Sequence, residues 1–594
     1  MTGFTTRPEI RGTFGVVTST HWIASAVGMA VLERGGNAFD AAVATGFVLQ
    51  VVEPHLNGPA GDLPVIYKTA SEAPLVLCAQ GVAPALATPE RMTAEGIDGL
   101  IPGSGLLATV VPGAWDGWLL LLRDHGTMEL ADVLAPAIGY ARDGHPMLAA
   151  VHHAIGGLKR FFEAEWPSSA AVWTPGGALP EADRLFRNPD LAATWTRLAA
   201  SRGDTREDRI DAARDAWRGG FVADAICDYL ADAKVMDVTG ERHSALLSRS
   251  DLAAWQAGIE APVTVDYHGW TVHKTGPWGQ GPVLLQALQI LKAFDLSAMD
   301  PFGEEFTHTV IEAIKLAWAD REAYYGDPDF ADIPMDVLLS EDYGRARAAL
   351  VGHGASTETR PGRIAGFEDW ADAAIARASR HVDVAEDPAT GEPTMAHLTD
   401  TRGDTVHLDI IDGWGNVVSA TPSGGWLQSN PVVPGLGFAL NSRAQMFWLD
   451  AGLASTLRPG ARPRTTLTPS IATRGDDVLS FGTPGGDQQD QWQLIWFLRF
   501  VHHGLDLQQG IDAPLFHSQH FQGSFYPRIA HPGRVMIEET IGAAIIHALR
   551  TRGHDVVVAP AHTVGRLTVA RRHADGMLQA AATPRLMQAY AIGR

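Results

Sequence analysis

An α+β fold with one interwoven core is the fold class that three features of the sequence predict. Residues 403–426 hold two strand patterns on either side of the turn-forming run DGWGN at 412–416. Residues 40–52 are almost wholly apolar, which is typical of a buried helix. Three further strand patterns lie within residues 554–583. Because strand patterns recur along the chain, we expect the strands to share one sheet system rather than to form separable domains.

The other elements follow from periodicity and turn chemistry. Strands are expected at 15–18, 64–68, 75–79, 264–274, 417–421 and 478–482, and helices at 24–33, within 112–150, within 155–250, and at 282–294, 306–325 and 541–551. Asp487 is placed as the N-cap of a helix that runs to about His503, with Gly504 as its stop. The polar run at 201–209 is expected to be a loop, and residues 352–404, which lack periodicity, are the expected linker.

The first strand of the central hairpin places polar groups in a row. Polar and apolar side chains alternate along it, in the order Thr405, Val406, His407, Leu408, Asp409 and Ile410. Strict alternation predicts a strand with one buried face, whose other face would carry a hydroxyl, an imidazole and a carboxylate. Taken alone, Thr405 is an ordinary strand threonine, because threonine has a high β-propensity.

Composition narrows the class of protein. The 594 residues are 46% hydrophobic and 19% charged, so the chain can bury a large core and is not of a disordered type. Its formal net charge of −22 argues against a nucleic-acid partner. No run reaches the ~18 apolar residues that a membrane span needs, and the first residues lack the pattern of a secretory signal. The two cysteines, Cys78 and Cys227, could form a disulfide, but so few thiols in so long a chain fit a reducing cytoplasm better.

The motifs predict neither a metal nor a cofactor. The pairs His152-His153 and His502-His503 have no partner at metal-ligand spacing. Gly485-Gly486 is not followed by the Gly-Lys-Ser/Thr of a phosphate-binding loop. Two adjacent backbone N–H groups before a helix are instead suited to a developing oxyanion. A plain Gly-Gly turn is the structural alternative.

Four segments, in the right order and with matching gaps, resemble the gamma-glutamyltranspeptidase family. They are GGNAFDAAVATGFVLQVVEPH at 35–55, EAIKLAWADREAYYGDPDF at 312–330, RPRTTLTPS at 462–470 and GTPGG at 482–486. Residues 403–426 are similar to the start of the family's small subunit, where Thr-x-His begins the mature chain. The resemblance covers nearly the whole chain, and it implies the four-layer αββα sandwich of the N-terminal-nucleophile hydrolases.

The resemblance implies that the chain cuts itself between Asp404 and Thr405. The products would be a large subunit of residues 1–404 and a small subunit of residues 405–594, both interwoven in one core. The Thr405 hydroxyl would attack the Asp404 carbonyl to form an ester that water hydrolyses. A threonine hydroxyl needs a nearby base. In the mature enzyme that base would be the freed α-amine, which titrates near ~7.7–8.

The matching positions also imply further site residues. The resemblance gives Thr421 a hydrogen bond to the nucleophile and makes Ser423 a second hydroxyl of the site. It assigns the oxyanion site to Gly485-Gly486. Thr465-Thr466 stand where the family has small hydroxyl residues that contact the substrate carboxylate.

The residues that would set specificity depart from the family pattern. Ahead of Ala83-Pro84, Gln80 replaces an arginine that grips the α-carboxylate of a γ-glutamyl donor. Arg443 stands among residues where transpeptidases carry acids that hold the α-ammonium, and Gly425 replaces an asparagine. Glutamine cannot supply the charged bidentate fork of arginine. Both groups that read a free amino-acid head are therefore missing.

We therefore expect an autoprocessing threonine amidohydrolase or acyltransferase that cleaves an acyl amide through an acyl-enzyme on Thr405, with water or an amine as the acceptor. Hydrolysis of a non-standard acyl amide is favoured over transfer from glutathione. Ordinary glutathione hydrolysis or γ-glutamyl transfer is the first alternative. An uncleaved protein that binds a small molecule without chemistry is the second.

Overall fold

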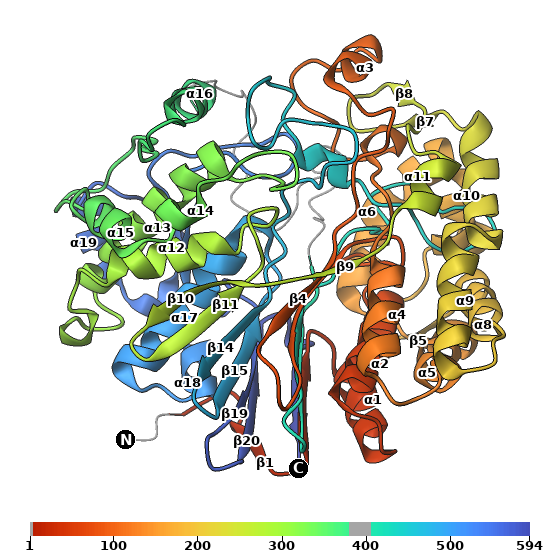
Figure 1. Cartoon of the computed structure of the whole chain (residues 1–594), viewed down its shortest axis with the longest axis horizontal. Helices are drawn as coiled ribbons and strands as arrows, with labels where there is room; N and C mark the ends of the chain where they lie inside the picture. Colours follow the sequence, from red (N-terminus) through yellow and green to blue (C-terminus); the bar gives the residue numbers. More distant parts are fainter. Residues whose placement is uncertain (1–3, 379–404) are drawn as a thin grey trace.

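Two antiparallel seven-stranded sheets lie face to face at the centre of the computed structural model (Figure 1), which describes residues 4–378 and 405–594. The first sheet has the order β1 (Ile10–Gly12), β20 (Leu578–Ala582), β19 (Thr568–Arg572), β15 (Asp477–Gly482), β14 (Ser470–Arg474), β11 (Trp270–Lys274) and β10 (Val263–Tyr267). The second has the order β21 (Tyr590–Gly593), β2 (Gly15–Ser19), β12 (Leu408–Asp412), β13 (Val417–Ala420), β3 (Leu63–Lys68), β4 (Leu75–Ala79) and β9 (Gly258–Glu260).

Helices cover the outer face of each sheet, as Figure 1 shows with the two sheets between a left and a right group of helices. The second sheet packs on α1 (Trp22–Glu33), α2 (Ala38–Val52) and α4 (Ala114–His125), and the first on α12 (Pro282–Leu291), α13 (Glu304–Tyr324) and α17 (Gln489–His503). A third apolar cluster, which includes Ile66, Ile411 and Ala570, lies between the sheets. The predicted four-layer αββα sandwich is thus confirmed.

Smaller elements surround these four layers. A lobe of helices follows α4: α5 (Leu130–Asp143), α6 (Ala149–Glu165), α7 (Pro167–Trp173), α8 (Pro189–Ala199), α9 (Arg206–Arg218), α10 (Phe221–Asp232) and α11 (Arg249–Ala254). The other helices are α3 (Pro89–Ala94), α14 (Met335–Leu338), α15 (Glu341–Ala348), α16 (Glu368–Ala378), α18 (Leu507–Asp512) and α19 (Ala543–Thr551). A three-stranded sheet contains β16 (Phe516–Ser518), β17 (Arg534–Glu538) and β18 (Asp555–Ala559).

Strands from both sides of residue 405 are combined in each of the two seven-stranded sheets. In the second sheet, β12 and β13 lie between β2 and β3, which precede them in the chain by more than 300 residues. In the first sheet, β1 and β10 form the two edges, and strands that follow residue 405 lie between them. Neither half of the chain therefore contains all the strands of either seven-stranded sheet.

The central hairpin has the predicted register but not the predicted exposure. Asp412 closes its turn, because its Oδ1 accepts the backbone N–H groups of Trp414, Gly415 and Asn416 at 3.0 Å each. The expectation of one buried and one exposed face is wrong, since every residue of β12 and β13 is buried. The cause is the sandwich itself: helix α2 covers one face of these strands and the other sheet covers the opposite face.

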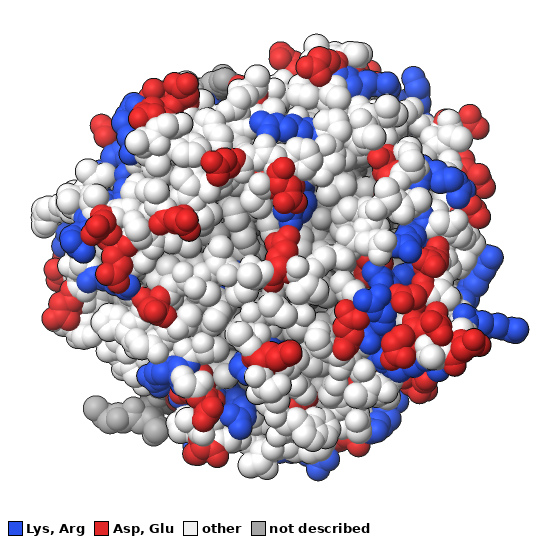
Figure 2. Space-filling view, viewed as in Figure 1, with Lys and Arg blue, Asp and Glu red and all other residues white. Residues whose placement is uncertain are grey.

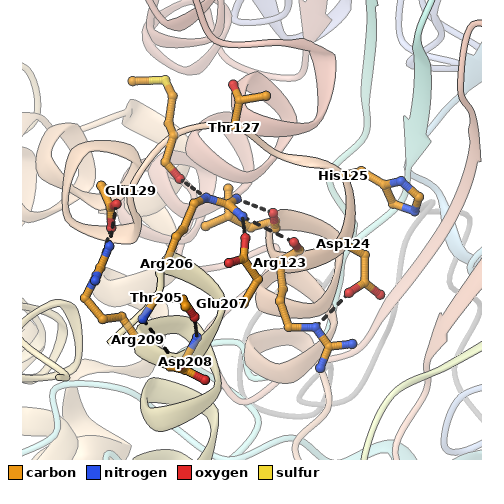
Figure 3. Close-up of polar contacts among 12 residues, drawn as sticks. Arg123, Asp124, His125, Thr127, Glu129, Thr205, Arg206, Glu207, Asp208 and Arg209 are labelled. Atoms are coloured by element: carbon orange, nitrogen blue, oxygen red, sulfur yellow. Dashed lines mark hydrogen bonds and ion pairs between the residues drawn. The ribbon is translucent and has the colours of Figure 1, made fainter. Parts of the chain in front are cut away.

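The polar run at 201–209 is only partly a loop, because α9 begins within it. Thr205 Oγ1 accepts the Asp208 N–H at 3.0 Å, and Asp208 Oδ2 accepts the Thr205 N–H at 3.0 Å, which is a complete capping box. Arg206 then donates to the carbonyls of Arg123 and Met128 at 3.2 and 2.8 Å (Figure 3). Arg123 belongs to the last turn of α4 and Met128 to the connection that follows it, so this run joins α9 to the end of α4.

Three further expectations also need correction. The strand expected at 264–274 is a hairpin, β10 and β11, which turns at His268 with a φ of 47°. The expected linker contains helix α16, and its residues 379–404 lie outside the described residues. In the two seven-stranded sheets, strands β1, β9, β14 and β21 were not predicted.

Charged groups of both signs are mixed on the surface. On the face shown in Figure 2, acidic and basic side chains lie side by side at the right, where α9 and α10 are found, and much of the centre is uncharged. The ion pairs Arg123–Asp211 and Arg209–Glu129 belong to this region. Within residues 4–378 and 405–594, no helix is long and apolar enough to cross a membrane.

Candidate active site

Thr405 lies at the mouth of the central hairpin, immediately before β12. It forms an antiparallel bridge with Ser423, and both residues are buried. Thr405 Oγ1 donates to Ser423 Oγ at 3.3 Å and accepts from Gln489 Nε2 at 3.4 Å. Asp404, on the other side of the expected cut, lies outside the described residues. A hydroxyl and an amide therefore both contact the expected nucleophile.

The Thr421 hydroxyl contacts the imidazole of the Thr-x-His run. Its Oγ1 lies 2.8 Å from His407 Nδ1, and the Thr405 hydroxyl contacts that of Ser423. The hydrogen bond that the resemblance gives Thr421 with the nucleophile stays a prediction. The strand register accounts for the observed pairs. The pairing of Leu408 with Ala420 continues outward to Thr405 with Ser423, so that Thr421 lies opposite His407.

A buried carboxylate lies one step further along the same face of the hairpin. Asp409 Oδ1 accepts from His407 Nε2 at 3.0 Å. The carboxylate also accepts four hydroxyl hydrogen bonds, from Thr18 (3.2 Å), Ser419 (3.2 Å), Ser480 (2.6 Å) and Thr568 (2.8 Å). These hydroxyls come from β2, β13, β15 and β19, so Asp409 joins the two sheets. The sequence showed these residue types in a row but not their connection.

The Gly485-Gly486 pair forms a tight turn before α17. Gly485 and Gly486 have φ values of 131° and 56°, and their N–H groups donate no hydrogen bond to any other described residue. An ideal Cβ at Gly485 would lie 2.3 Å from the Trp492 ring, so only glycine fits. Gln280 Nε2 donates to Gly486 O at 3.2 Å, which fixes the turn. The geometry suits donors aimed at an oxyanion.

Asp487 is not the N-cap of the following helix, as the sequence had suggested. A 3-10 turn at Gly486–Gln488 comes first, and α17 then starts at Gln489. The Asp487 carboxylate instead accepts from Arg321 Nη1 at 2.6 Å and from Ser524 Oγ at 2.7 Å. Because Arg321 also donates to Gln280 Oε1 at 2.7 Å, this ion pair supports the glycine turn.

A cluster of buried arginines lies behind this turn and was not predicted. Arg321 and Arg464 lie 2.9 and 2.8 Å from Glu322 Oε1. Burial alone would raise the pKa of Glu322, but Arg464 and Arg321 outweigh it and lower that pKa to about 2. The only sequence signal was the acid-base run within residues 312–330.

The pair Thr465-Thr466 lies beside the glycine turn. Thr465 O accepts the Gln280 N–H at 2.9 Å, and Gln280 in turn contacts Gly486. Thr466 Oγ1 is buried and has no hydrogen-bond partner among the residues that the structure describes. Gln489 Oε1 accepts the N–H of Thr468 at 3.2 Å, so one side chain joins this segment to Thr405. Gln489 is a site residue that the sequence did not reveal.

The two departures from the family pattern, Gln80 and Arg443, meet at one carboxylate. Arg443 Nε donates to Asp62 Oδ2 at 2.7 Å, and both side chains are fully buried. Burial raises the pKa of Asp62 to about 6, although Arg443 opposes the rise. Gln80 lies next to Asp62, and its two amide atoms make no hydrogen bond of good geometry within the described chain. Gly424 approaches the same pair, since a Cβ there would lie 3.1 Å from Asp62.

Histidine and carboxylate groups that could hold a metal come together once in the described ranges. His308, Glu312 and His554 offer ligand atoms within 4.8 Å of one another. Lys315 Nζ and Arg360 Nη2 lie 2.7 and 3.3 Å from Glu312, so two cations already face its carboxylate. The His152-His153 and His502-His503 pairs are not part of this group.

A protein-family model described as gamma-glutamyltranspeptidase matches residues 24–593. The glutathione hydrolase-like YwrD proenzyme of Bacillus subtilis (strain 168) is 29% identical, over 97% of this chain and 98% of its own length. The oxamate amidohydrolase proenzyme of Klebsiella pneumoniae is also 29% identical, over 96% of this chain and 97% of its own length.

Solved structures agree with this match. A structure of LmbA2991 is 52% identical with a TM-score of 0.91 over 100% of both chains. The cephalosporin acylase from Bacillus halodurans is 27% identical with a TM-score of 0.83, over 100% of this chain and 98% of its own. The hydrolase, amidohydrolase and acylase among these relatives each cover at least 96% of this chain, so this protein is an enzyme of that kind. With its fold, its Thr-x-His hairpin and a family match over nearly all its length, the chain belongs to the gamma-glutamyltranspeptidase family.

Proposed function

We propose that this enzyme is an autoprocessing threonine amidohydrolase, which cuts its own chain between Asp404 and Thr405 and then cleaves an acyl amide through an ester on Thr405. The observation that carries the proposal is the position of Thr405 Oγ1, which is buried at the start of β12 and held by Ser423 and Gln489. Gln489 belongs to the helix that follows Gly485-Gly486, so nucleophile and oxyanion donors share one support. The names of relatives as proenzymes support the self-cleavage.

In both self-cleavage and substrate cleavage, a group must accept the proton that leaves the Thr405 hydroxyl. In the uncut chain the Thr405 hydroxyl adds to the Asp404 carbonyl, the peptide nitrogen takes the proton and leaves as the α-amine, and water hydrolyses the ester. In the processed enzyme the α-amine accepts the hydroxyl proton while Oγ attacks the substrate amide. The leaving amine receives that proton, and water then releases the acid. Gly485-Gly486 would stabilise the oxyanion of each tetrahedral intermediate.

The substrate proposed is an acyl amide without an α-ammonium group. Arg443, which pairs with Asp62, brings a guanidinium to a position where transpeptidases place acids. The buried Gln80 amide and Thr466 hydroxyl can read neutral or carboxylate oxygens of the acyl group. Oxamate, in the name of one relative, is such an amide: it has a carboxylate and no amino group at the α-position.

Gel electrophoresis and N-terminal sequencing test the self-cleavage. Wild-type protein should give bands of about 43 and about 20 kDa, the shares of the 63.6 kDa chain before and after the cut. The small chain should begin Thr-Val-His-Leu-Asp. Thr405→Ala should remain a single soluble chain without amidase activity, and Thr405→Ser should cut more slowly. A different N-terminus, or an uncut wild-type chain that turns over substrate, would rule out Thr405.

Paired p-nitroanilides test the specificity. The glutaryl anilide lacks the α-ammonium of the γ-glutamyl anilide but keeps its length and one carboxylate. We expect a higher kcat/KM for the glutaryl substrate. A higher kcat/KM for the γ-glutamyl substrate would favour ordinary γ-glutamyl chemistry instead. A single 63.6 kDa band with no turnover of either would favour a binding protein.

A further inference from the structure

The face of the central hairpin that carries Thr405 contains a continuous hydrogen-bonded chain. Its successive cross-strand pairs are Thr405 with Ser423, His407 with Thr421, and Asp409 with Ser419. Asp409 contacts His407 Nε2 at 3.0 Å, and His407 Nδ1 contacts Thr421 Oγ1 at 2.8 Å. All three side chains are fully buried. Thr421 lies one rung from Thr405, within reach of the α-amine that self-cleavage would create.

We propose that Asp409 and His407 are positioning residues, which fix the Thr421 hydroxyl as a hydrogen-bond acceptor for the α-amine of Thr405. The inference rests on the proposed function, because it assigns a task to residues around its nucleophile. It adds two residues, His407 and Asp409, that neither contact substrate nor take part in the bond changes.

The contacts of Asp409 determine which group donates in each of these hydrogen bonds. Four hydroxyls and one imidazole donate to its two oxygens, which is about the number of acceptor sites that an ionised carboxylate has. The ring nitrogen that faces it, Nε2, therefore carries a proton. A neutral imidazole then has its lone pair on Nδ1, and the Thr421 hydroxyl must donate there. Toward Thr405, the Thr421 hydroxyl can therefore act only as a hydrogen-bond acceptor.

The position of the imidazole ring is also fixed by packing. An ideal Cβ at Gly482, on the neighbouring strand β15, would lie 2.2 Å from the His407 ring. Glycine at this position thus leaves the space that the ring fills. Since Ser480 of the same strand donates to Asp409 at 2.6 Å, one strand supports both members of the pair.

Asp409→Asn tests the proposal, with Thr568→Val as the matched control. Asparagine can donate to Nε2, which would move the imidazole proton to Nδ1 and turn the Thr421 hydroxyl away. The processed variant should lose at least tenfold in kcat/KM, and the acidic limb of its pH profile should shift. Thr568→Val removes an equally buried hydrogen bond to the same carboxylate but keeps the imidazole tautomer. Its pH profile should match the wild type. An unchanged rate and pH profile for Asp409→Asn would overturn the inference.

A pair of Thr421 variants and a spectroscopic measurement that needs no processing extend the test. Thr421→Ser retains the hydroxyl, and its kcat/KM should stay within threefold of the wild-type value. Thr421→Val keeps the shape without the hydroxyl, and its kcat/KM should fall as far as that of Asp409→Asn. Equal rates for the two Thr421 variants would overturn the proposal.

The tautomer of His407 can be determined without catalysis, by ¹⁵N-histidine NMR on uncut Thr405→Ala, with His407→Gln to identify the signal. A proton on Nε2 of His407 supports the proposed series of hydrogen bonds, and a proton on Nδ1 alone contradicts it. If the wild-type protein is uncut and inactive, the proposed function is wrong. If the wild-type protein is active but His407 is protonated on Nδ1, only this inference is wrong.

Discussion

Single residues in this enzyme are constrained by what surrounds them at close range. Gly485 has room for no side chain beside Trp492, and His407 occupies the space that Gly482 leaves. Glycine doublets and a Thr-x-His run were visible in the sequence, so the catalytic candidates could be named in advance. The partner of Thr421 could not, because it depends on strand register, and neither could Gln489, whose contact with Thr405 spans 84 residues.

Gly485→Ala should lower turnover by roughly 10²-fold, because a displaced turn no longer aims its N–H groups at the oxyanion. Its Cβ would lie 2.3 Å from Trp492, at a φ of 131°. Gly435→Ala is the control, since that glycine also has a positive φ, 76°, but nothing lies within 4 Å of its Cβ. Initial rates on the processed enzymes measure the effect. Near-normal rates for Gly485→Ala would place the oxyanion site elsewhere.

Glu53 gives a pH dependence of stability. Burial raises its pKa from 4.5 to about 8, against the hydrogen bond from Thr20 at 2.6 Å and the charge of Arg566. The folded protein therefore keeps a proton that the unfolded chain releases between these values. Stability should fall as the pH rises from about 4.5 to about 8, by on the order of 5 kcal/mol at most.

Comparison with Glu53→Gln isolates this contribution from that of other buried groups. Urea unfolding midpoints of the two proteins, on the uncut Thr405→Ala background, should diverge as pH rises from 5 to 8, with the wild-type residue losing stability. If the two midpoints stay parallel, Glu53 does not titrate in this range.

At the scale of elements, periodicity predicted those that local chemistry defines. Helix α2 was expected at 40–52 and spans Ala38–Val52, where Asn37 and Asp40 form a capping box. Elements set by distant contacts were missed. The carboxylate of Asp487 looked like a helix cap, but its partner Arg321 lies 166 residues away. The turn between β10 and β11 was missed because His268, rather than the usual asparagine or aspartate, precedes Gly269 there; the two residues have φ values of 47° and 81°.

Thr205→Ala should lower the free energy of unfolding by about 1 kcal/mol, because it removes the cap of α9. Thr551→Ala is the matched control. The Thr551 hydroxyl donates to His547 O within α19 at 3.0 Å, and alanine is a better helix former there. Chemical denaturation of the uncut chain compares the two. Equal losses would show that the capping box at Thr205 contributes no special stability.

At the scale of the whole molecule, the four-layer fold could be predicted because the motifs resemble those of a family with that fold. That strands from both sides of residue 405 share a sheet could be predicted from the positions of the strand patterns along the sequence. Each of the two seven-stranded sheets contains strands from both sides of that residue. After cleavage, the chains of 1–404 and 405–594 should therefore remain together. Size-exclusion chromatography of the processed protein should give one peak with both bands, at every urea concentration below the unfolding transition. Separation of the chains before that transition would contradict this.

The strand order also has a consequence for kinetics. In the uncut chain, β12 and β13 are tethered to the strands they insert between, so folding is a first-order process. A cut before Thr405 removes the tether, and recovery after complete unfolding then requires two chains to meet. Refolding yield should be independent of protein concentration for Thr405→Ala but should rise with concentration for processed wild type. Activity and far-ultraviolet circular dichroism after dilution from urea distinguish the two orders. The processed enzyme would thus keep its structure chiefly by unfolding slowly, since dilution works against its return.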